Sequence, residues 1–228
     1  SAGLSAGTSL SCESIHKPSP TLKRIADSTV RRLSLYLRFL EEFEEAGLTT
    51  VSSDELAARG GTTSAQVRKD LSFFGSFGKR GLGYPVDELT QRMRSILGLE
   101  RDWRIIIVGV GKIGAALAQY EGFQQRGFHV VGLYDSDPAK IGREMYGLTI
   151  RAITDLAEDN RERPVDIAVL AVPADAAQRV LDQVVAAGVT GIMSFAPIQL
   201  HVPADVTLNA VNMAMELERL SFALSNRE

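Results

Sequence analysis

An α/β fold in two parts is the class that this 228-residue sequence predicts, and three observations lead to it. Residues 52–84 have the spacing of a helix-turn-helix followed by a glycine-rich hairpin. From Trp103 onward, continuous apolar runs alternate with helical stretches, as in a parallel sheet covered on both faces. The first of these runs leads into Gly109-x-Gly111-x-x-Gly114, the turn of dinucleotide-binding sheets. We therefore expect an N-terminal winged-helix (helix-turn-helix) domain and a C-terminal Rossmann-like parallel sheet domain.

The first predicted helix follows a Ser-, Gly- and Pro-rich stretch over 1–22, which we expect to be a disordered tail. Asp27 or Ser28 can cap this helix by accepting hydrogen bonds from its free N–H groups. From Val30 onward, apolar residues recur every three or four positions, so one face should be buried. The helix should end near Ala46-Gly47.

Two short helices come next. Ser52 should cap the first, Gly60-Gly61 forms the turn, and Thr62 or Thr63 caps the second, which runs to about Gly75.

A hairpin then follows, because Gly81 and Gly83 permit a tight tip that would form the wing. A helix over 87–97 leads to Gly98, where we expect the winged-helix domain, 23–98, to end.

The second domain is expected over 99–210, with a final helix in 211–228. Its expected strands are 105–108, 128–135, 165–172, 189–195 and 206–211. Its expected helices are 113–120, 155–161, 174–187 and 211–225. The last of these helices carries an apolar stripe that needs cover.

The glycine motif carries the cofactor prediction. Gly109 allows the tight turn, Gly111 lets the backbone approach a pyrophosphate, and Gly114 lets the helix pack close to the sheet. Lys112 adds a positive charge beside the phosphates. Asp135 ends the next strand, where a carboxylate can accept hydrogen bonds from ribose hydroxyls and repel a 2′-phosphate, so NAD(H) is favoured over NADP(H). The alternative is an α/β core whose glycines serve packing alone.

The third helix offers a candidate DNA face. Val67, Leu71 and Phe74 share one side at helical spacing and should face the core. Side chains that can bind base edges in the major groove then remain near the outer surface: Ser64, Gln66, Arg68, Lys69 and Ser72. Lys79 and Arg80, on the wing, can reach phosphates or the minor groove. The alternative is a solvated amphipathic helix in a protein-binding module.

The charge distribution, the lengths of the apolar runs and the cysteine content further limit the class of protein. The net charge is −3, but residues 1–85 carry +2 and residues 86–228 carry −5, so the basic charge is local. No apolar run approaches the roughly 18–20 residues of a membrane span, and no signal-peptide pattern is present. The single cysteine, Cys12, can form neither an internal disulfide nor a zinc site. We expect a cytoplasmic protein without membrane or metal partners.

Five stretches of the sequence resemble those of a known family. They are Arg32-Leu33-x-x-Tyr36-Leu37-Arg38, Gln66-Val67-Arg68-Lys69-Asp70-Leu71-Ser72, residues 75–84, Tyr120-Glu121-Gly122-Phe123 and Phe195-Ala196-Pro197. In them the chain resembles the Rex family of redox-sensing transcriptional repressors, from about Thr29 to Ala223. The resemblance implies a homodimer that binds NAD⁺ and NADH. It also implies binding to double-stranded operator DNA at an inverted repeat, with release when NADH accumulates. The C-terminal helix is implied to be domain-swapped, so that it is a dimerisation helix against the partner subunit.

On this basis the expected cofactor site extends beyond the glycines and Asp135. It includes Val110, Lys112, Ile113, Tyr120, Ser136, Lys140, Val172, Pro173, Phe195, Ala196 and Met213. The expected DNA contacts also include Arg32, Ser53 and Tyr84. Phe195, Met213 and Tyr120 would close over the nicotinamide, and because a cation is costly to desolvate there, NADH should bind more tightly than NAD⁺.

One position departs from the family. The resemblance implies an Asp at the start of the last helix that exchanges partners between an arginine of the first helix and a tyrosine near the nicotinamide. Here these positions match Asn212, Arg38 and Tyr120, so the expected switch lacks a charge-assisted pair and should be weaker or biased toward the NADH-bound state. Ser194 also stands where the family commonly has Asn.

Two rival functions remain. A dehydrogenase would need a substrate domain and an acid–base residue, but only one helix follows the sheet. The three histidines, His16, His129 and His201, fall in the tail, at a strand start and in a loop, so we expect no enzyme. The other rival is an NAD(H)- or CoA-binding regulator whose N-terminal domain binds protein; only a binding assay separates it.

Overall fold

The structure of this chain is a computed structural model that describes residues 25–75 and 83–226. The chain divides between Leu97 and Gly98 into two compact units, each with its own core. The expected disordered tail, 1–22, lies outside the described residues.

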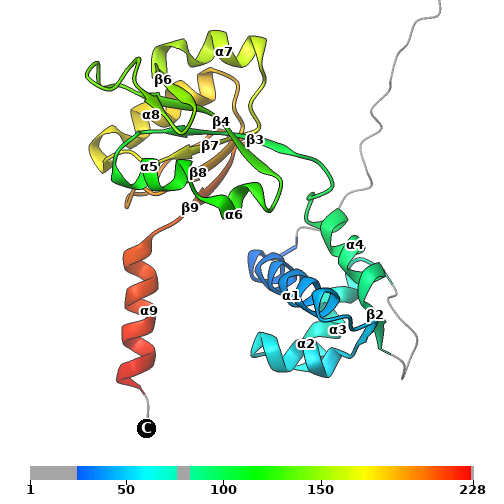
Figure 1. The fold of residues 1–228 in the computed structure, drawn as a ribbon. Coiled ribbons are helices and arrows are strands. Elements are labelled where there is room, and N and C mark those ends of the chain that lie inside the picture. Colours follow the sequence, from blue (N-terminus) through cyan, green and yellow to red (C-terminus); the bar gives the residue numbers. More distant parts are fainter. Residues whose placement is uncertain (1–24, 76–82, 227–228) are drawn as a thin grey trace, which may run out of the picture. The chain divides into compact units, whose positions relative to one another are not determined.

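The first unit is mainly helical (Figure 1). Its described elements are α1 (Asp27–Glu45), β1 (Thr50–Val51), α2 (Ser53–Gly60), α3 (Ser64–Ser72), β2 (Tyr84–Pro85) and α4 (Val86–Ile96). The apolar face of α1 is buried as its spacing predicts, with Leu33, Leu37 and Leu40 almost inaccessible. Val67 on α3 and Met93 on α4 are equally buried, so the helices share one core.

The helix starts follow local capping chemistry. The Ser52 hydroxyl accepts a hydrogen bond from Glu55 N, and the Glu55 carboxylate accepts one from Ser52 N, which completes a capping box at α2. Thr63, and not Thr62, caps α3. The prediction that Asp27 or Ser28 caps α1 was wrong, because Ala26 occupies the N-cap and makes no side-chain cap bond. Asp27 instead lies in the first turn, where its charge suits the positive helix end.

The strands β1 and β2 pair antiparallel, and β2 begins at Tyr84, the last residue of the stretch where the wing was expected. Gly83, which precedes β2, has a φ of +77°, and a Cβ there would stand 2.6 Å from the Val51 carbonyl oxygen. Glycine is therefore required by both conformation and space. Lys79, Arg80 and Gly81, the predicted wing tip, lie outside the described residues.

The second unit is built on a seven-stranded sheet in the order β5-β6-β4-β3-β7-β8-β9. Its strands are β3 (Trp103–Val108), β4 (Phe128–Asp135), β5 (Glu144–Met145), β6 (Leu148–Ala152), β7 (Ile167–Leu170), β8 (Gly191–Ser194) and β9 (Thr207–Ala210). Its helices are α5 (Lys112–Ala118), α6 (Glu121–Gln124), η1 (Ile153–Asp155), α7 (Leu156–Glu162), α8 (Ala174–Ala186) and α9 (Met213–Ser225). All neighbours pair parallel except β5 with β6.

Both faces of this sheet are covered (Figure 1), which explains its continuous apolar strands. Ile106 and Val108 of β3 enter one cluster with residues of α7 and α8. Ile105 and Ile107 enter the opposite cluster, with residues of α5 and α6 packed against it. The Rossmann-like prediction is thus confirmed by the observed order, in which the chain leaves β3 first toward β4 and then toward β7.

Four details differ from the sequence predictions. The ends of the predicted strands shift by one or two residues, and the short β5–β6 hairpin was not predicted. The helix expected to run to Tyr120 ends at Ala118, and α6 follows as a separate turn. The last helix begins at Met213, not Val211, because Asn212 is its N-cap.

We expect Gly83→Ala to destabilise the first unit more than Gly47→Ala. Both glycines have a φ near +75°, at +77° and +75°, but a Cβ at Gly47 would meet nothing within 4 Å. Gly47→Ala should therefore lose only the conformational cost of roughly 1 kcal/mol, and Gly83→Ala about 1–2 kcal/mol more because β1 must shift. Hydrogen exchange of the full chain at Val51 measures the difference, and equal exchange in both variants contradicts the argument.

Candidate cofactor and DNA-binding sites

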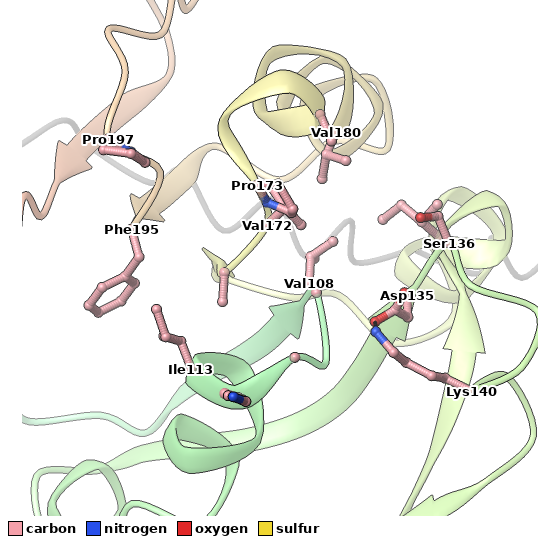
Figure 2. A pocket seen from close by; sticks show the side chains of 16 residues that line it. Val108, Ile113, Asp135, Ser136, Lys140, Val172, Pro173, Val180, Phe195 and Pro197 are labelled. Carbon is pink, nitrogen blue, oxygen red and sulfur yellow. Dashed lines mark hydrogen bonds and ion pairs between the residues drawn. The ribbon is translucent and has the colours of Figure 1, made fainter.

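A cavity of about 490 Å³ opens at the carboxyl ends of the parallel strands, at the point where the strand order reverses. Figure 2 shows it from close by. Its lining consists of Val108, Gly109, Gly111, Lys112, Ile113, Asp135, Ser136, Lys140, Ile153, Ala171, Val172, Pro173, Ala176, Val180, Phe195 and Pro197. Its size suits a small-molecule or cofactor site.

The three motif glycines each meet a different demand. Gly109 has a φ of +94°, and a Cβ there would stand 2.6 Å from the Ala171 carbonyl oxygen, so the turn passes closely over β7. Gly114 lies against the Gly109 carbonyl, which leaves no space for a side chain at the start of α5. A Cβ at Gly111, in contrast, would point into open space. The backbone at Gly111 is thus accessible from the cavity, as a closely approaching phosphate requires.

Asp135, at the end of β4, is a buried carboxylate in the wall of the cavity. It is only 6% exposed, and its carboxylate accepts hydrogen bonds from Val110 N at 2.8 Å, Asp137 N at 2.9 Å and Lys140 Nζ at 2.9 Å. Burial opposes the charged form, but the bond from Lys140 and the two backbone N–H groups outweigh it and hold the pKa of Asp135 below its ordinary value. The carboxylate therefore stays ionised and ties β4 to the glycine turn.

The cavity has a polar end and an apolar end. In Figure 2, Asp135, Ser136 and Lys140 lie at one side, whereas Phe195 and Pro197 lie at the other. A ligand that spans it would place one part among charged and hydroxyl groups and another part against apolar side chains.

The cavity brings together nine of the predicted cofactor residues in addition to Asp135: Gly109, Gly111, Lys112, Ile113, Ser136, Lys140, Val172, Pro173 and Phe195. Gly114, Val110 and Ala196 are buried beside it and support its walls. Sequence analysis missed Val108, Ile153, Ala171, Ala176, Val180 and Pro197, which also line it. Ala176 and Val180 follow Pro173 at helical spacing, a signal that could have found them.

Tyr120 and Met213 do not line this cavity in the described chain. Tyr120 is 58% exposed and contacts Phe123 edge to face, and Met213 is 57% exposed on α9. Asn212 caps α9 through its Oδ1, which accepts hydrogen bonds from Ala214 N and Met215 N. Arg38 is exposed on α1. The roles expected of these residues in a switch stay predictions.

The candidate DNA face lies on α3. Val67 and Leu71 are buried, as predicted, but Phe74 is only half-buried. Among the predicted contacts, Arg68, Lys69 and Ser72 are exposed, whereas Ser64 and Gln66 are half-buried.

Two other residues that the sequence predicts to contact DNA lie outside α3. Ser53, on α2, accepts a hydrogen bond from the Arg68 guanidinium at 2.9 Å, which fixes that side chain along the surface. Tyr84, on β2, is half-buried, and burial raises its pKa.

Sequence analysis missed a fully buried carboxylate, Asp70, behind this face. Asp70 accepts two hydrogen bonds from the Arg32 guanidinium, at 2.6 and 2.8 Å, and others from the Tyr36 hydroxyl at 3.1 Å and Gln66 Nε2 at 2.8 Å. Burial opposes its charge, but the bonds from Arg32, Gln66 and Tyr36 lower its pKa below the ordinary value. The i, i+4 spacing of Gln66 with Asp70, and of Arg32 with Tyr36, was the available signal.

Within the described residues, no helix is long and apolar enough to cross a membrane. The same part of the chain contains no group of three or more His, Cys, Asp or Glu side chains arranged to hold a metal ion.

Comparisons with known proteins bear on both sites. A family model described as "CoA binding domain" matches residues 100–198, and one described as "Putative DNA-binding protein N-terminus" matches residues 18–72. The "Redox-sensing transcriptional repressor Rex" of Streptomyces coelicolor is 46% identical, over 91% of this chain and 80% of its own. That of Syntrophomonas wolfei is 48% identical, over 90% of this chain and 98% of its own. The chain belongs to the Rex family of redox-sensing transcriptional repressors.

Two solved structures of a Rex-family repressor, RSP, agree with this assignment. RSP in complex with β-NAD⁺ and operator DNA has a TM-score of 0.84 and 36% identity, over 89% of this chain and 93% of that one. RSP in complex with β-NADH has a TM-score of 0.80 and 34% identity, over 89% and 95%. Rex relatives are named as transcriptional repressors, not as enzymes, which agrees with the expectation from the sequence.

We expect Asp135→Asn to flatten the acid dependence of stability. The folded pKa lies below the ordinary value of 3.8, so the stabilisation is present above that pH and is lost as pH falls through the folded pKa. The variant should be about 1–2 kcal/mol less stable near neutral pH and should lose less stability on acidification. Urea unfolding across acidic pH measures this. Ser136→Ala, which removes a neighbouring hydroxyl and no charge, is the control and should keep the wild-type slope.

Proposed function

We propose that this protein is a redox-sensing transcriptional repressor that binds operator DNA and releases it when NADH binds. The observation that carries the proposal is the combination of two sites in one chain. The glycine turn and the ionised Asp135 form a dinucleotide cavity, and α3 exposes Arg68 and Lys69 on a helix-turn-helix. The complexes of RSP with operator DNA, NAD⁺ and NADH support the same pairing of ligands for this chain.

The residues present fit a dinucleotide. The open side of Gly111 would accept the pyrophosphate, with Lys112 beside it. Asp135 would accept hydrogen bonds from the adenosine ribose, and its ionised state would disfavour a 2′-phosphate, so we propose NAD(H) and not NADP(H). The nicotinamide would then reach toward Phe195 at the apolar end.

Preference for the reduced cofactor follows from that apolar end. The nicotinamide ring is cationic in NAD⁺ and neutral in NADH. Val172, Phe195 and Pro197 offer no charge to a cation, so removing it from water there costs more than removing the neutral ring. We propose that Tyr120 and Met213 complete this enclosure when NADH binds.

The proposed active form is a homodimer. All residues of α9 from Met213 onward lack burial, and its large apolar side chains include Leu217, Leu220 and Phe222, at 68%, 54% and 72% exposure. A partner subunit would cover them. A dimer that reads two half-sites at fixed spacing loses its grip if NADH turns the DNA-binding units, and DNA then weakens NADH binding by the same factor. Because operator DNA is its ligand, we place the protein in the cytoplasm as part of this proposal.

A second candidate is a CoA-binding regulator, because the family model described as "CoA binding domain" matches the cavity-bearing residues 100–198. Fluorescence anisotropy of a labelled inverted-repeat duplex, titrated with NADH, NAD⁺ and CoA at fixed salt, separates the candidates. We expect NADH to release the duplex at a concentration at least about tenfold below that of NAD⁺, with no effect of CoA. Release of the duplex by CoA alone would favour the second candidate. If the protein binds NADH but no duplex, a regulator whose N-terminal domain binds protein would remain.

We expect Gly111→Ala to separate cofactor sensing from DNA binding. A Cβ at this position meets no atom of the chain, so the unfolding free energy should change by less than about 0.5 kcal/mol. The methyl group would nevertheless stand where the pyrophosphate approaches, so NADH should bind roughly tenfold or more weakly and fail to release the duplex. Ala116→Ser, an exposed change on α5, is the control. Normal release of DNA from Gly111→Ala by NADH would place the cofactor elsewhere.

A further inference from the structure

We propose that Asp70 fixes the orientation of the Gln66 amide, so that Gln66 selects a base with an amino group in the major groove. The inference deepens the proposed DNA-binding function and rests on it. Its basis is the hydrogen bond from Gln66 Nε2 to Asp70 Oδ1, at 2.8 Å, between side chains one turn apart on α3.

The direction of this amide follows from chemistry. A carboxylate only accepts hydrogen bonds, so the group of Gln66 that faces Asp70 must be the NH₂ group and not the carbonyl oxygen. Asp70 remains a carboxylate because the Arg32 guanidinium binds both of its oxygens, at 2.6 and 2.8 Å. Rotation of the amide by half a turn would bring its oxygen against this buried charge and is excluded.

The carboxylate itself cannot move. Asp70 is 0% exposed, and Tyr36 donates a further hydrogen bond to it from α1 at 3.1 Å. Arg32 is held in turn by a hydrogen bond to the Thr29 hydroxyl at 3.0 Å. These contacts join α3 to α1 and hold the Asp70 carboxylate in place beside Gln66, a half-buried side chain at the DNA face.

A fixed amide has a definite preference among bases. One N–H of the Gln66 NH₂ group is donated to Asp70, so the carbonyl oxygen and the second N–H remain for DNA. The oxygen accepts from adenine N6–H or cytosine N4–H, and at adenine the second N–H can also donate to N7. Guanine O6 and thymine O4 stand where those amino groups would be, so they repel the fixed carbonyl oxygen and leave only the second N–H to bind them, which makes these bases the weaker choice. Without Asp70, a glutamine amide can turn over and donate to those bases. Asp70 is thus a positioning residue, and Gln66 the residue that determines specificity.

The test is selection of duplexes with randomised half-sites, arranged as an inverted repeat, by the full-length protein. In the wild type, one position of each half-site should favour adenine or cytosine over guanine or thymine on one strand by about five- to tenfold. Gln66→Ala should abolish this preference at that position and leave the others unchanged. Asp70→Asn, which offers both a donor and an acceptor to Gln66, should reduce the same preference to less than about twofold.

A matched control comes from the second unit. On α8, Gln178 Nε2 also donates to a carboxylate one turn later, Asp182 Oδ1, at 2.8 Å. Asp182→Asn removes the same kind of contact away from α3 and should leave every base preference intact. If Asp70 had a purely structural role, Asp70→Asn would instead weaken binding to all duplexes alike. The base preference at the position that Gln66→Ala identifies would then stay the same.

The outcomes are distinct. If the Gln66-dependent position favours guanine or thymine, or if Gln66→Ala changes no position, the inference is overturned while the proposed function stands. If Asp70→Asn does not fold, the wild-type and Gln66→Ala profiles still decide the amino preference. If the wild type selects no duplex at all, the proposed function fails and the inference fails with it.

Discussion

The hydrogen bond from Val110 N to the buried Asp135 carboxylate is the interaction on which the cofactor site depends. Val110 lies within the glycine turn after β3, and Asp135 ends β4, so this bond fixes the turn relative to the sheet. A buried charge without partners is costly, and Asp135 meets that demand with two backbone N–H groups and Lys140. The same contacts that keep the carboxylate ionised therefore also hold the backbone open at Gly111.

A second buried carboxylate acts in a comparable way in the first unit. Asp70 binds side chains of α1 and α3, where Asp135 binds mainly backbone. Asp135 positions the backbone of the glycine turn. Asp70 positions side chains that would otherwise rotate. In both units, the ligand specificity that we propose depends on a buried acid whose pKa is held low by its hydrogen-bond donors.

The sequence predicted the features that depend on local spacing. Alternation of apolar runs and helices gave the Rossmann-like sheet, and the glycine motif with Asp135 located its cavity. The Asp70 cluster escaped prediction because Arg32 and Asp70 are 38 positions apart and meet only when α1 packs near α3. The β5–β6 hairpin escaped because its strands are short and lie at the sheet edge. The places of Tyr120, Met213 and Arg38 in a site depend on how separate parts of the protein come together, which spacing alone does not encode.

The neutral cap of α9 has a consequence for the order of assembly. A helix of this length is marginal in water when its apolar side is uncovered, so a newly made chain would hold α9 only loosely before meeting a partner. Asn212 satisfies two of the first free N–H groups of α9 from within the same chain. In the dimer proposed above, the first turn of α9 is thereby formed before the two subunits meet, which lowers the ordering entropy that association must overcome. Because an amide carries no titratable proton, this preparation is independent of cellular pH.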